Sequence, residues 1–374
     1  MQAIRSILVV LEPEHSESLA LKRAKLIAGV TRAHLHLLVC DRKHDHSAML
    51  GVLKAALVAD GYSVTTEQAW ESSLHETIVT VQQAEGCGLV IKQHYPDSPL
   101  KKALLTPEDW KVLRTCPTPV LLVKTAGSWK DKVILAAVDV GNIDGEHRHL
   151  HNTIIDYGYD IASMAKAHLH VISAHPSPML SSADPTFQLS ETIEARYREQ
   201  CKAFQAEFDV DDEHLHIAEG PADVLIPFMV HKLQAAVTVI GTVARSGLSG
   251  TLIGNTAEVV LDAVESDVLV LKPQEVEDHL DEIASKHYAL LCLTDDDRGQ
   301  ARAHGVFIDL AGAGLPAMLF ISRRMHHSET PARYSAGNAL LKAKRIPDQW
   351  RPAAPAGSSR ETPAAAPCRR LPGC

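Results

Sequence analysis

Short apolar runs recur along the first 273 residues of the chain and alternate with longer stretches in which apolar residues have a helical spacing. Runs such as Ile7–Leu11 are apolar at every position, which is typical of strands buried on both faces. Between the runs, Ala20, Ala24 and Ile27 follow at intervals of four and three residues and predict a helix, which Gly29 is expected to end. The alternation predicts an α/β fold with a parallel sheet covered by helices on both faces.

The same pattern occurs twice. Four apolar runs of the first half have partners in the same order in the second half, which indicates an internal duplication. The matched runs are Ile7–Glu12 with Ile134–Asp139, Ala33–Leu38 with Ala167–Ile172, Leu89–Lys92 with Thr238–Gly241, and Pro119–Lys124 with Asp267–Lys272. Two helical stripes correspond as well, namely Met49, Val52, Leu53 and Leu57 with Ile193, Tyr197, Phe204 and Phe208. Each half is therefore predicted to be β-α-β-α-β-α-β-α-β.

The duplication divides the chain into four parts. We predict an N-terminal domain over residues 1–124, a linker over 125–131, a C-terminal domain over 132–273 and an extension over 274–374. From about Tyr288 onward basic residues outnumber acidic ones, and the last residues are rich in Pro, Ala, Gly and Arg, which predicts partial disorder. An accessory extension and an altered reading frame are both open, and we assign this part no function.

Composition narrows the classes of function. The formal net charge of -9 argues against a general nucleic-acid binder, because such proteins need a basic surface. No apolar run is long enough to cross a bilayer, and Met1–Arg5 lead into a strand without the layout of a signal peptide. The seven cysteines are scattered without a C-x-x-C pair, which argues against disulfides and a zinc site and predicts a cytoplasmic protein.

One segment combines features of an anion site. Residues 241–258 follow a predicted strand, contain four glycines, and enter a helix for which Asn255 and Glu258 predict an N-cap and a capping box. Such a turn brings backbone N–H groups toward an anion, and Arg245 adds a positive charge. The spacing matches neither the P-loop nor G-x-G-x-x-G, and glycines that serve only turns and packing are the alternative. Ligands bind beyond the carboxyl ends of parallel strands, which places Asp139 beside this segment.

The spacing of these glycines resembles the phosphate loop of the universal stress protein family. In that pattern a glycine is followed by two residues, a second glycine, nine residues, a third glycine and a Ser or Thr. Gly241 and Gly254 match the outer glycines, whereas Ala244 replaces the second glycine and Asn255 replaces the hydroxyl residue. Together with Leu105–Trp110, the duplicated order of strands makes residues 1–273 similar to the tandem-domain type of this family.

The resemblance implies two five-stranded Rossmann-like sheets, of the adenine nucleotide alpha hydrolase type, packed as an intramolecular pseudo-dimer through Val120–Lys124 and Val268–Lys272. A homodimer of the whole chain is left open. The resemblance also implies a cleft for ATP in the C-terminal domain. An amphipathic ligand in the same cleft is the alternative, because Ala244 and Asn255 depart from the pattern. The implied cleft residues are Asp139, Val140 and Ala174 near the base, and Gly241, Thr242, Val243, Ala244, Arg245, Gly254, Asn255 and Thr256 near the phosphates.

The first half lacks the corresponding loop. Its segment Lys92–Leu100 contains no glycine. Thr106 predicts a helix N-cap before Pro107, and Glu108 and Asp109 follow in the first helical turn, where their charges would repel a triphosphate. We therefore expect this domain to be structural.

The remaining candidate residues predict no catalysis. One histidine group is expected to be a solvated surface cluster, and two pairs that alternate with leucine are expected to pack on a sheet face rather than bind metal. These are His147, His149 and His151, and the pairs His34/His36 and His168/His170. No G-x-S-x-G elbow is present. We predict a stress-response protein that acts by binding a ligand or partner, with no metal and no catalytic residue. The alternative is a switch that binds, and slowly hydrolyses, ATP in the C-terminal domain.

Overall fold

The computed structural model describes residues 1, 4–14, 18–95, 106–141, 145–175, 190–242, 255–274, 276–284, 305–308 and 319–322. The strands of the main sheet are β1 Ser6–Leu11, β2 His34–Cys40, β3 Val64–Ala69, β4 Leu89–Gln93, β5 Val120–Val123, β6 Val133–Ala137, β7 His168–His175, β8 Leu215–Glu219, β9 Ala235–Gly241 and β10 Asp267–Leu271. The labelled helices are α1 Leu19–Thr31, α2 Ser47–Ala59, α3 Leu74–Glu85, α4 Pro107–Thr115, α5 Gly145–Ala165, α6 Ser190–Phe208, α7 Ala222–Leu233 and α8 Asn255–Ala263, and residues 276–284 are helical as well. A separate antiparallel pair consists of β11 Gly305–Ile308 and β12 Leu319–Ser322.

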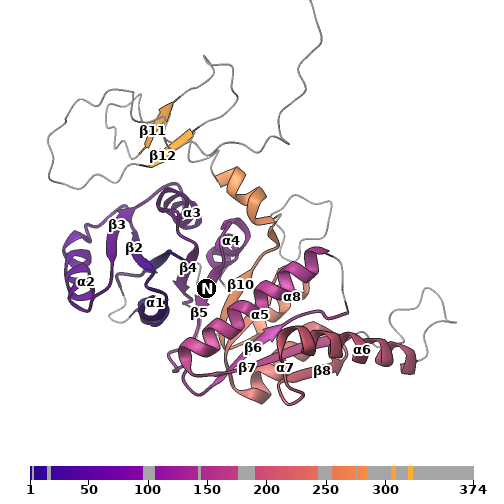
Figure 1. Ribbon diagram of the computed structural model, residues 1–374. Helices are drawn as coiled ribbons and strands as arrows, with labels where there is room; N and C mark the ends of the chain where they lie inside the picture. The colour runs from indigo at the N-terminus through magenta and orange to yellow at the C-terminus, as the bar shows by residue number, and fades with distance from the viewer. Residues whose placement is uncertain are drawn as a thin grey trace, which may run out of the picture. The chain divides into compact units, whose positions relative to one another are not determined.

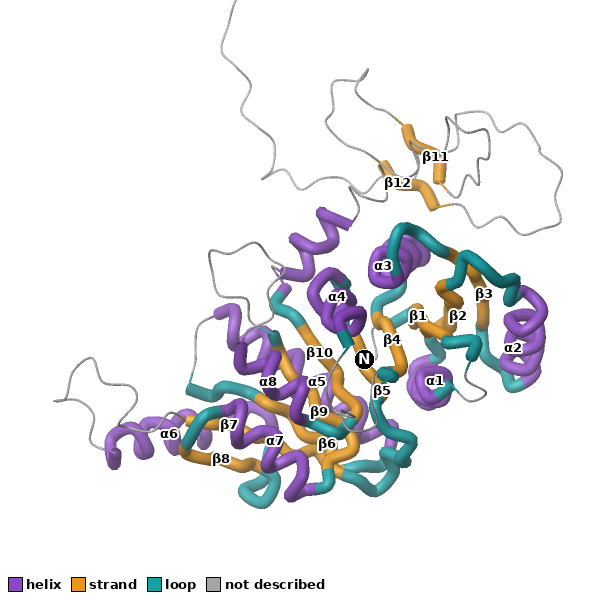
Figure 2. Tube along the Cα trace, turned by 180° about the vertical axis from the view of Figure 1, so that it is seen from behind, coloured by secondary structure: helices purple, strands orange, loops and turns teal. Residues whose placement is uncertain are grey.

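The two halves of the chain share one ten-stranded sheet, with strand order β3-β2-β1-β4-β5-β10-β9-β6-β7-β8 (Figures 1 and 2). Within each half the neighbouring strands are parallel. The halves meet where β5 and β10 pair antiparallel, with Leu121 opposite Leu269. The predicted order of elements and the predicted contact between the fifth strands are confirmed. This pairing also removes two strand edges that would otherwise be open to aggregation.

The strand register aligns the two halves residue by residue. Val10 of β1 pairs with Lys92 of β4, and Ala137 of β6 pairs with Ile240 of β9. Since Val10 and Ala137 occupy the same place in the repeat, Lys92 corresponds to Ile240. The match made from sequence, which paired Lys92 with Gly241, is wrong by one residue. Such an error of one residue is easy to make when two continuous apolar runs are aligned, because no alternating polar positions define their register.

Helices pack on both faces of the sheet in the described part of the chain. Helices α1, α2, α5 and α6 contribute buried residues to one core, and α3, α4, α7 and α8 contribute to the other. The first core includes Ala20, Ala24, Ile27, Leu50, Leu57, Leu150, Ile154 and Phe204, and the second includes Ile78, Val112, Leu113, Met229, Val260 and Leu261. The near-continuous apolar strands are therefore buried on both sides, as their pattern predicts.

Two details of the helix predictions are wrong. Helix α1 does not end at Gly29 but continues to Thr31, and Arg32 closes it in the left-handed conformation at φ 60°. A single glycine inside a helix costs only about 1 kcal/mol, which the buried face of α1 outweighs. In α2, Leu50 and Leu57 are buried, whereas Val52 is 71% exposed although it was expected in the apolar stripe.

The junction between the halves has a pair of symmetric lysines. After β5, Lys124 donates from Nζ to the carbonyl oxygens of Leu261 (2.7 Å) and Val264 (2.9 Å) at the end of α8. After β10, Lys272 donates to the carbonyl of Cys116 (2.7 Å) at the end of α4. Each half therefore supplies a cation that caps the last helix of the other half, which the helix dipole favours. Burial lowers the pKa of Lys124 to about 8 and also lowers the pKa of Lys272.

A buried carboxylate fastens the connection between the halves. Asp267, at the start of β10, is fully buried and accepts hydrogen bonds from Arg23 Nε of α1 (2.8 Å) and Trp129 Nε1 (2.7 Å). Its other oxygen accepts from the backbone N–H groups of Lys124 (2.8 Å) and Thr125 (2.9 Å).

The segment expected as a linker is thus anchored to both halves, through Asp267 of the second half and Arg23 of the first. Arg23 adds hydrogen bonds to the carbonyls of Thr125 (3.1 Å) and Gly127 (2.6 Å), and its guanidinium lies 4.6 Å from the Trp129 ring centre. The proposed boundaries at residues 124 and 131 stay predictions. Most of the predicted extension, including the region from Tyr288 to β11 and the Pro-rich end, lies outside the described residues.

Replacing Asp267 by asparagine should lower the free energy of unfolding by about 3–5 kcal/mol, because Arg23 would stay buried without a counter-charge. Urea denaturation measures the loss. The matched control is Asp60→Asn, which breaks the exposed Lys25–Asp60 ion pair of the same 2.8 Å length and should cost at most about 1 kcal/mol. Equal costs for the two substitutions would contradict the anchoring role of Asp267.

Candidate functional site

Several predicted cleft residues that the structure describes lie at the carboxyl ends of neighbouring strands. Asp139 and Val140 follow β6, Ala174 belongs to β7, Gly241 ends β9 and Thr242 follows it. Parallel pairing of β6 with β7 and β9 brings these carboxyl ends together. Asp139 is exposed, Ala174 is half-buried and Val140 is buried. The arrangement agrees with a ligand position beyond the strand ends.

The turn after β6 is held by hydrogen bonds to its neighbours. The Asp139 N–H donates to His151 Nε2 of α5 (3.3 Å), and the Val140 N–H donates to the Ser173 hydroxyl (3.2 Å). The Asp139 carboxylate accepts from the Gly141 N–H (3.1 Å). These contacts leave the Asp139 side chain at the surface of the site.

His151 corrects one prediction. It was expected in a solvated surface cluster, but it is buried and accepts from the turn after β6. His149 is exposed as expected, and the side chain of His147 lies outside the described part. The sequence does not show that the helix carrying His151 covers the carboxyl end of β6.

Two rings line the same turn. The Tyr197 ring of α6 lies 5.1 Å from the His175 ring at the end of β7. A Cβ atom at Gly141 would lie 2.1 Å from the Tyr197 hydroxyl oxygen, so this position accepts no larger residue without movement of the tyrosine. The sequence placed Tyr197 only in a packing stripe, and its contact with the site was missed.

Gly241 has a packing role of its own. A Cβ atom there would lie 2.6 Å from Leu150 Cδ2 and 3.0 Å from Ile154 Cδ1, both of α5. The glycine therefore lets α5 approach β9 closely. The buried Thr242 that follows donates its N–H to the carbonyl of Leu271 (2.8 Å).

The centre of the predicted phosphate loop lies outside the described residues. This applies to Val243, Ala244, Arg245 and Gly254. Helix α8 begins at Asn255 itself, and Thr256 in its first turn is exposed. The roles of these residues as phosphate ligands stay predictions.

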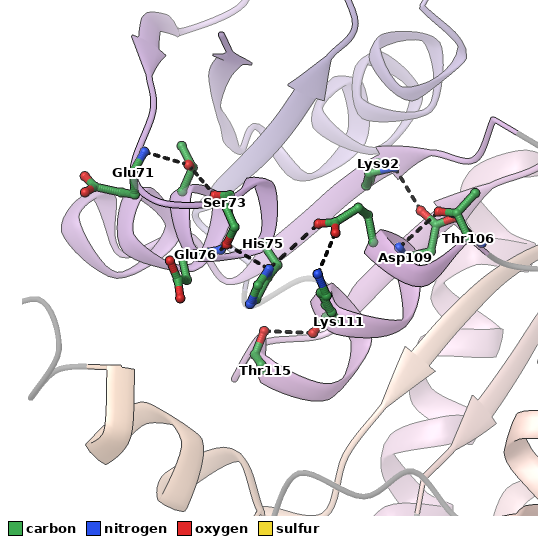
Figure 3. Close-up of polar contacts among 11 residues, drawn as sticks. Glu71, Ser73, His75, Glu76, Lys92, Thr106, Asp109, Lys111 and Thr115 are labelled. Carbon is green, nitrogen blue, oxygen red and sulfur yellow. Dashed lines mark hydrogen bonds and ion pairs between the residues drawn. The ribbon is translucent and has the colours of Figure 1, made fainter. Parts of the chain in front are cut away.

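In the first half the corresponding place is filled by a buried ionic network (Figure 3). Lys92 of β4 donates to Asp109 Oδ1 (2.8 Å), and His94 Nδ1 lies 2.7 Å from Asp109 Oδ2. All three side chains are buried. Burial raises the pKa of Asp109, but the hydrogen bond from His94 and the charge of Lys92 outweigh this and hold that pKa well below its usual range.

The start of α4 agrees with the prediction. Thr106 caps the helix, and Asp109 completes a capping box with it. Glu108, also in the first turn, contacts Lys111 Nζ (2.8 Å) and His75 Nδ1 (3.8 Å). Carboxylates therefore occupy the helix N-terminus where a phosphate would otherwise be attracted.

The second half has no such ionic pair at the equivalent positions. The register that matches Lys92 with Ile240 also matches Leu122 with Val270, so Asp109 corresponds to Ala257. Ile240 and Ala257 are both buried in the core of that face. The first half of the duplicated fold therefore has a charged pair at the positions where the second half has an apolar pair.

His34, His36 and His170 are buried or half-buried on the sheet as predicted, whereas His168 is exposed, so the packing prediction is wrong for His168. His34 and His36 share contacts with Thr65 of β3 (2.7 and 2.8 Å). In the second half, His170 Nδ1 lies 2.9 Å from His216 Nε2, and the two rings are stacked. Burial, followed by the charges of neighbouring histidines, lowers the pKa of His170 to about 4.

One cluster was missed altogether from sequence. Asp41, His44 and His46 follow β2, and their ligand atoms lie within 4.8 Å of one another. The signal in the sequence was the D-x-x-H-x-H spacing directly after a predicted strand.

No helix in the described part of the chain is both long and apolar enough to cross a membrane.

A double-mutant cycle tests the ionic network. Asp109→Ala alone should destabilise the protein by about 3 kcal/mol, because Lys92 stays buried and charged. Adding Lys92→Ile recreates the apolar pair of the second half and should recover about 1–3 kcal/mol. Chemical denaturation of the two single variants and the double variant gives the coupling energy, and additive costs of the two substitutions would contradict the coupling.

The pH dependence of stability tests the His170 cluster. Between about pH 6.5 and pH 4 the unfolded state binds more protons at this residue than the folded state, so stability should fall as the pH is lowered. Because the ring is half-buried, we expect a contribution on the order of 1 kcal/mol between pH 7 and pH 5. His170→Phe should flatten the profile measured by denaturation, whereas His149→Gln should leave it unchanged. The same slope in all three proteins would refute the assignment.

Comparisons with known proteins agree with this architecture. The profile of the universal stress protein family matches residues 132–272. The universal stress protein E homolog of Haemophilus influenzae is 28% identical over 73% of this chain and 99% of its own length, and universal stress protein E of Escherichia coli K12 is 26% identical over 74% and 96%. Two structures from Pseudomonas aeruginosa have TM-scores of 0.72. A functionally unknown protein from strain PAO1 is 68% identical over 76% of this chain and 98% of its own, and one provisionally named a universal stress protein, from UCBPP-PA14, is 67% identical over 76% and 99%. The chain therefore belongs to the universal stress protein family, as a tandem-domain member similar to universal stress protein E.

Proposed function

We propose that this protein acts in the cytoplasmic stress response by binding a small ligand in its second half, without catalysing a reaction. The observation that carries the proposal is the difference between the two halves at one place in the fold. The first half has the buried Lys92–Asp109 pair there, and the second half has Ile240 and Ala257. The first half then serves as the structural partner that completes the sheet.

The chemistry around the second-half turn favours a ligand with a flat or amphipathic part. The half-buried ring of Tyr197, which contacts the buried His175, lies at this turn together with the exposed carboxylate of Asp139. Aromatic faces stack on planar groups, and a few polar atoms then orient the ligand. Specific recognition of an amphipathic molecule needs this combination.

ATP is the second candidate ligand. A protein that binds ATP at this place would act as a nucleotide switch. The outer glycines Gly241 and Gly254 support it, because their spacing is that of the family's phosphate loop. Ala244 and Asn255 weigh against it. An alanine where the backbone needs a positive φ costs on the order of 1 kcal/mol, and its methyl group obstructs close approach of phosphate.

The test combines identification and titration. The full chain is purified natively and denatured, and the released small molecules are identified by mass spectrometry; calorimetry then measures binding of ATP and of any molecule found. We expect close to one ligand per chain. ATP affinity that appears only after Ala244→Gly with Asn255→Ser would exclude the switch and leave the other ligand class. Absence of any ligand, released or titrated, would refute the proposal.

A matched pair of charge substitutions locates the site. Thr256→Glu places a carboxylate in the exposed first turn of α8, as Glu108 does in α4, and should weaken binding of an anionic ligand at least tenfold. Val259→Glu adds the same charge at an exposed position of the same helix, farther from its N-terminus, and should bind as the unmodified protein does. Equal effects of the two substitutions would place the ligand elsewhere.

A further inference from the structure

The loop that follows β2 brings three potential metal ligands to one point. Asp41 Oδ2 lies 2.9 Å from His44 Nδ1 and 2.8 Å from His46 Nε2. Both rings thus aim a nitrogen at the same carboxylate oxygen. Among the described residues, these three form the group whose ligand atoms all lie within 4.8 Å of one another.

The carboxylate is oriented for this role by a backbone hydrogen bond. Its second oxygen, Oδ1, accepts the backbone N–H of Lys43 (2.7 Å), which turns Oδ2 toward the histidines.

One side chain of the neighbouring strand fixes the backbone of all three residues. Gln68 of β3 donates from Nε2 to the carbonyls of Asp41 (3.0 Å) and His44, and its Oε1 accepts the N–H of His46 (2.7 Å). A loop of six residues that is held at three points needs little further ordering when an ion binds. Such supporting contacts commonly change metal affinity by about 10–100-fold when they are removed.

We infer that Asp41, His44 and His46 form a site for a divalent transition-metal ion, with Zn²⁺ as the representative. In a tetrahedral site with metal–ligand bonds of about 2.0–2.2 Å the ligand atoms lie about 3.4 Å apart, so atoms that already lie within 4.8 Å of one another need side-chain shifts on the order of 1 Å. Two imidazoles and one carboxylate select zinc or its first-row neighbours over magnesium and calcium, which prefer oxygen. The set also leaves a coordination position for water or a ligand.

The site has a defined place in the duplicated fold. Leu38 of β2 and Ile172 of β7 are equivalent, because each pairs with the corresponding residue of the first strand in its half. Asp41 therefore corresponds to His175, which contacts Tyr197 at the candidate cleft of the second half. The two halves carry different chemistry at the same end of the sheet, and this inference is independent of the ligand proposed for the second half.

The other histidine cluster is a weaker candidate. His170 and His216 stack with their rings nearly parallel, and His214 meets His170 edge to face. His170 Nδ1 lies 2.9 Å from His216 Nε2, so these two nitrogens contact each other rather than converge with a third ligand on one centre. This cluster therefore serves as the internal control for the test.

Calorimetry with Zn²⁺ on the full, untagged chain after treatment with a chelator tests the inference. We expect one site with a dissociation constant below about 10 µM, and at least tenfold weaker binding in His44→Ala and in Asp41→Asn. The His44 side chain is 73% exposed, so its removal does not threaten the fold. His149→Ala, at an exposed position of α5, should bind Zn²⁺ as the unmodified chain does.

Two further measurements keep the result decisive. Gln68→Leu should weaken Zn²⁺ binding about 10–100-fold although Gln68 is no ligand, with circular dichroism confirming the fold. Co²⁺ bound to the unmodified chain should give a visible absorption band that His44→Ala lacks. Unchanged Zn²⁺ affinity in His44→Ala, or a loss of the site in His170→Phe, would overturn the inference. So would the absence of binding at 10 µM, since the loop would then be held by hydrogen bonds alone.

Discussion

The position of one buried carboxylate decides how the two halves of the chain are joined. Asp267 begins β10 and accepts hydrogen bonds from α1 and from the segment after β5, which belong to the first half and its connection to the second. A fully buried charge is tolerated only when it is paired and hydrogen-bonded, so these contacts form together or not at all. The consequence is a short, fixed junction that holds β5 against β10 and makes one sheet out of two.

Around this junction the duplication is partly symmetric and partly not. Lys124 and Lys272 have the same role, because each caps the last helix of the opposite half. Pro119, the counterpart of Asp267 in the repeat, has no carboxylate to offer, so the anchor exists on one side alone. The two halves have diverged in the same way at another pair of equivalent positions. The first half has Lys92 and Asp109 there, and the second half has Ile240 and Ala257. A pseudo-dimer inside one chain permits this, because each half can change without changing its partner.

Much of the fold follows from the sequence because it rests on pattern. Near-continuous apolar strands, helical stripes and a repeated order predict two joined α/β units, and the cap at Thr106 follows from local chemistry. The errors arise where pattern carries no information. The register of Lys92 was misplaced by one residue, and the end of α1 was placed at Gly29 because tertiary packing was not visible.

The site is harder to predict, because it is made of residues that are distant along the chain. Asp139 could be placed from its position after a strand, but the contacts of His151 and Tyr197 depend on how α5 and α6 cross the sheet. Asp41, His44 and His46 are close in sequence, yet their convergence depends on Gln68 of another strand. Spacing alone shows which residues can meet, and packing decides which of them do.

Hydrogen–deuterium exchange of the full chain, with and without the ligand that it retains, tests most directly whether the second half is the binding half. Ligand should slow exchange at residues 139–141, 241–242 and 255–259, and should leave residues 92–95 and 106–112 unchanged. Slower exchange at 92–95 and 106–112 would contradict the account, since it would place the ligand where the buried Lys92–Asp109 pair lies.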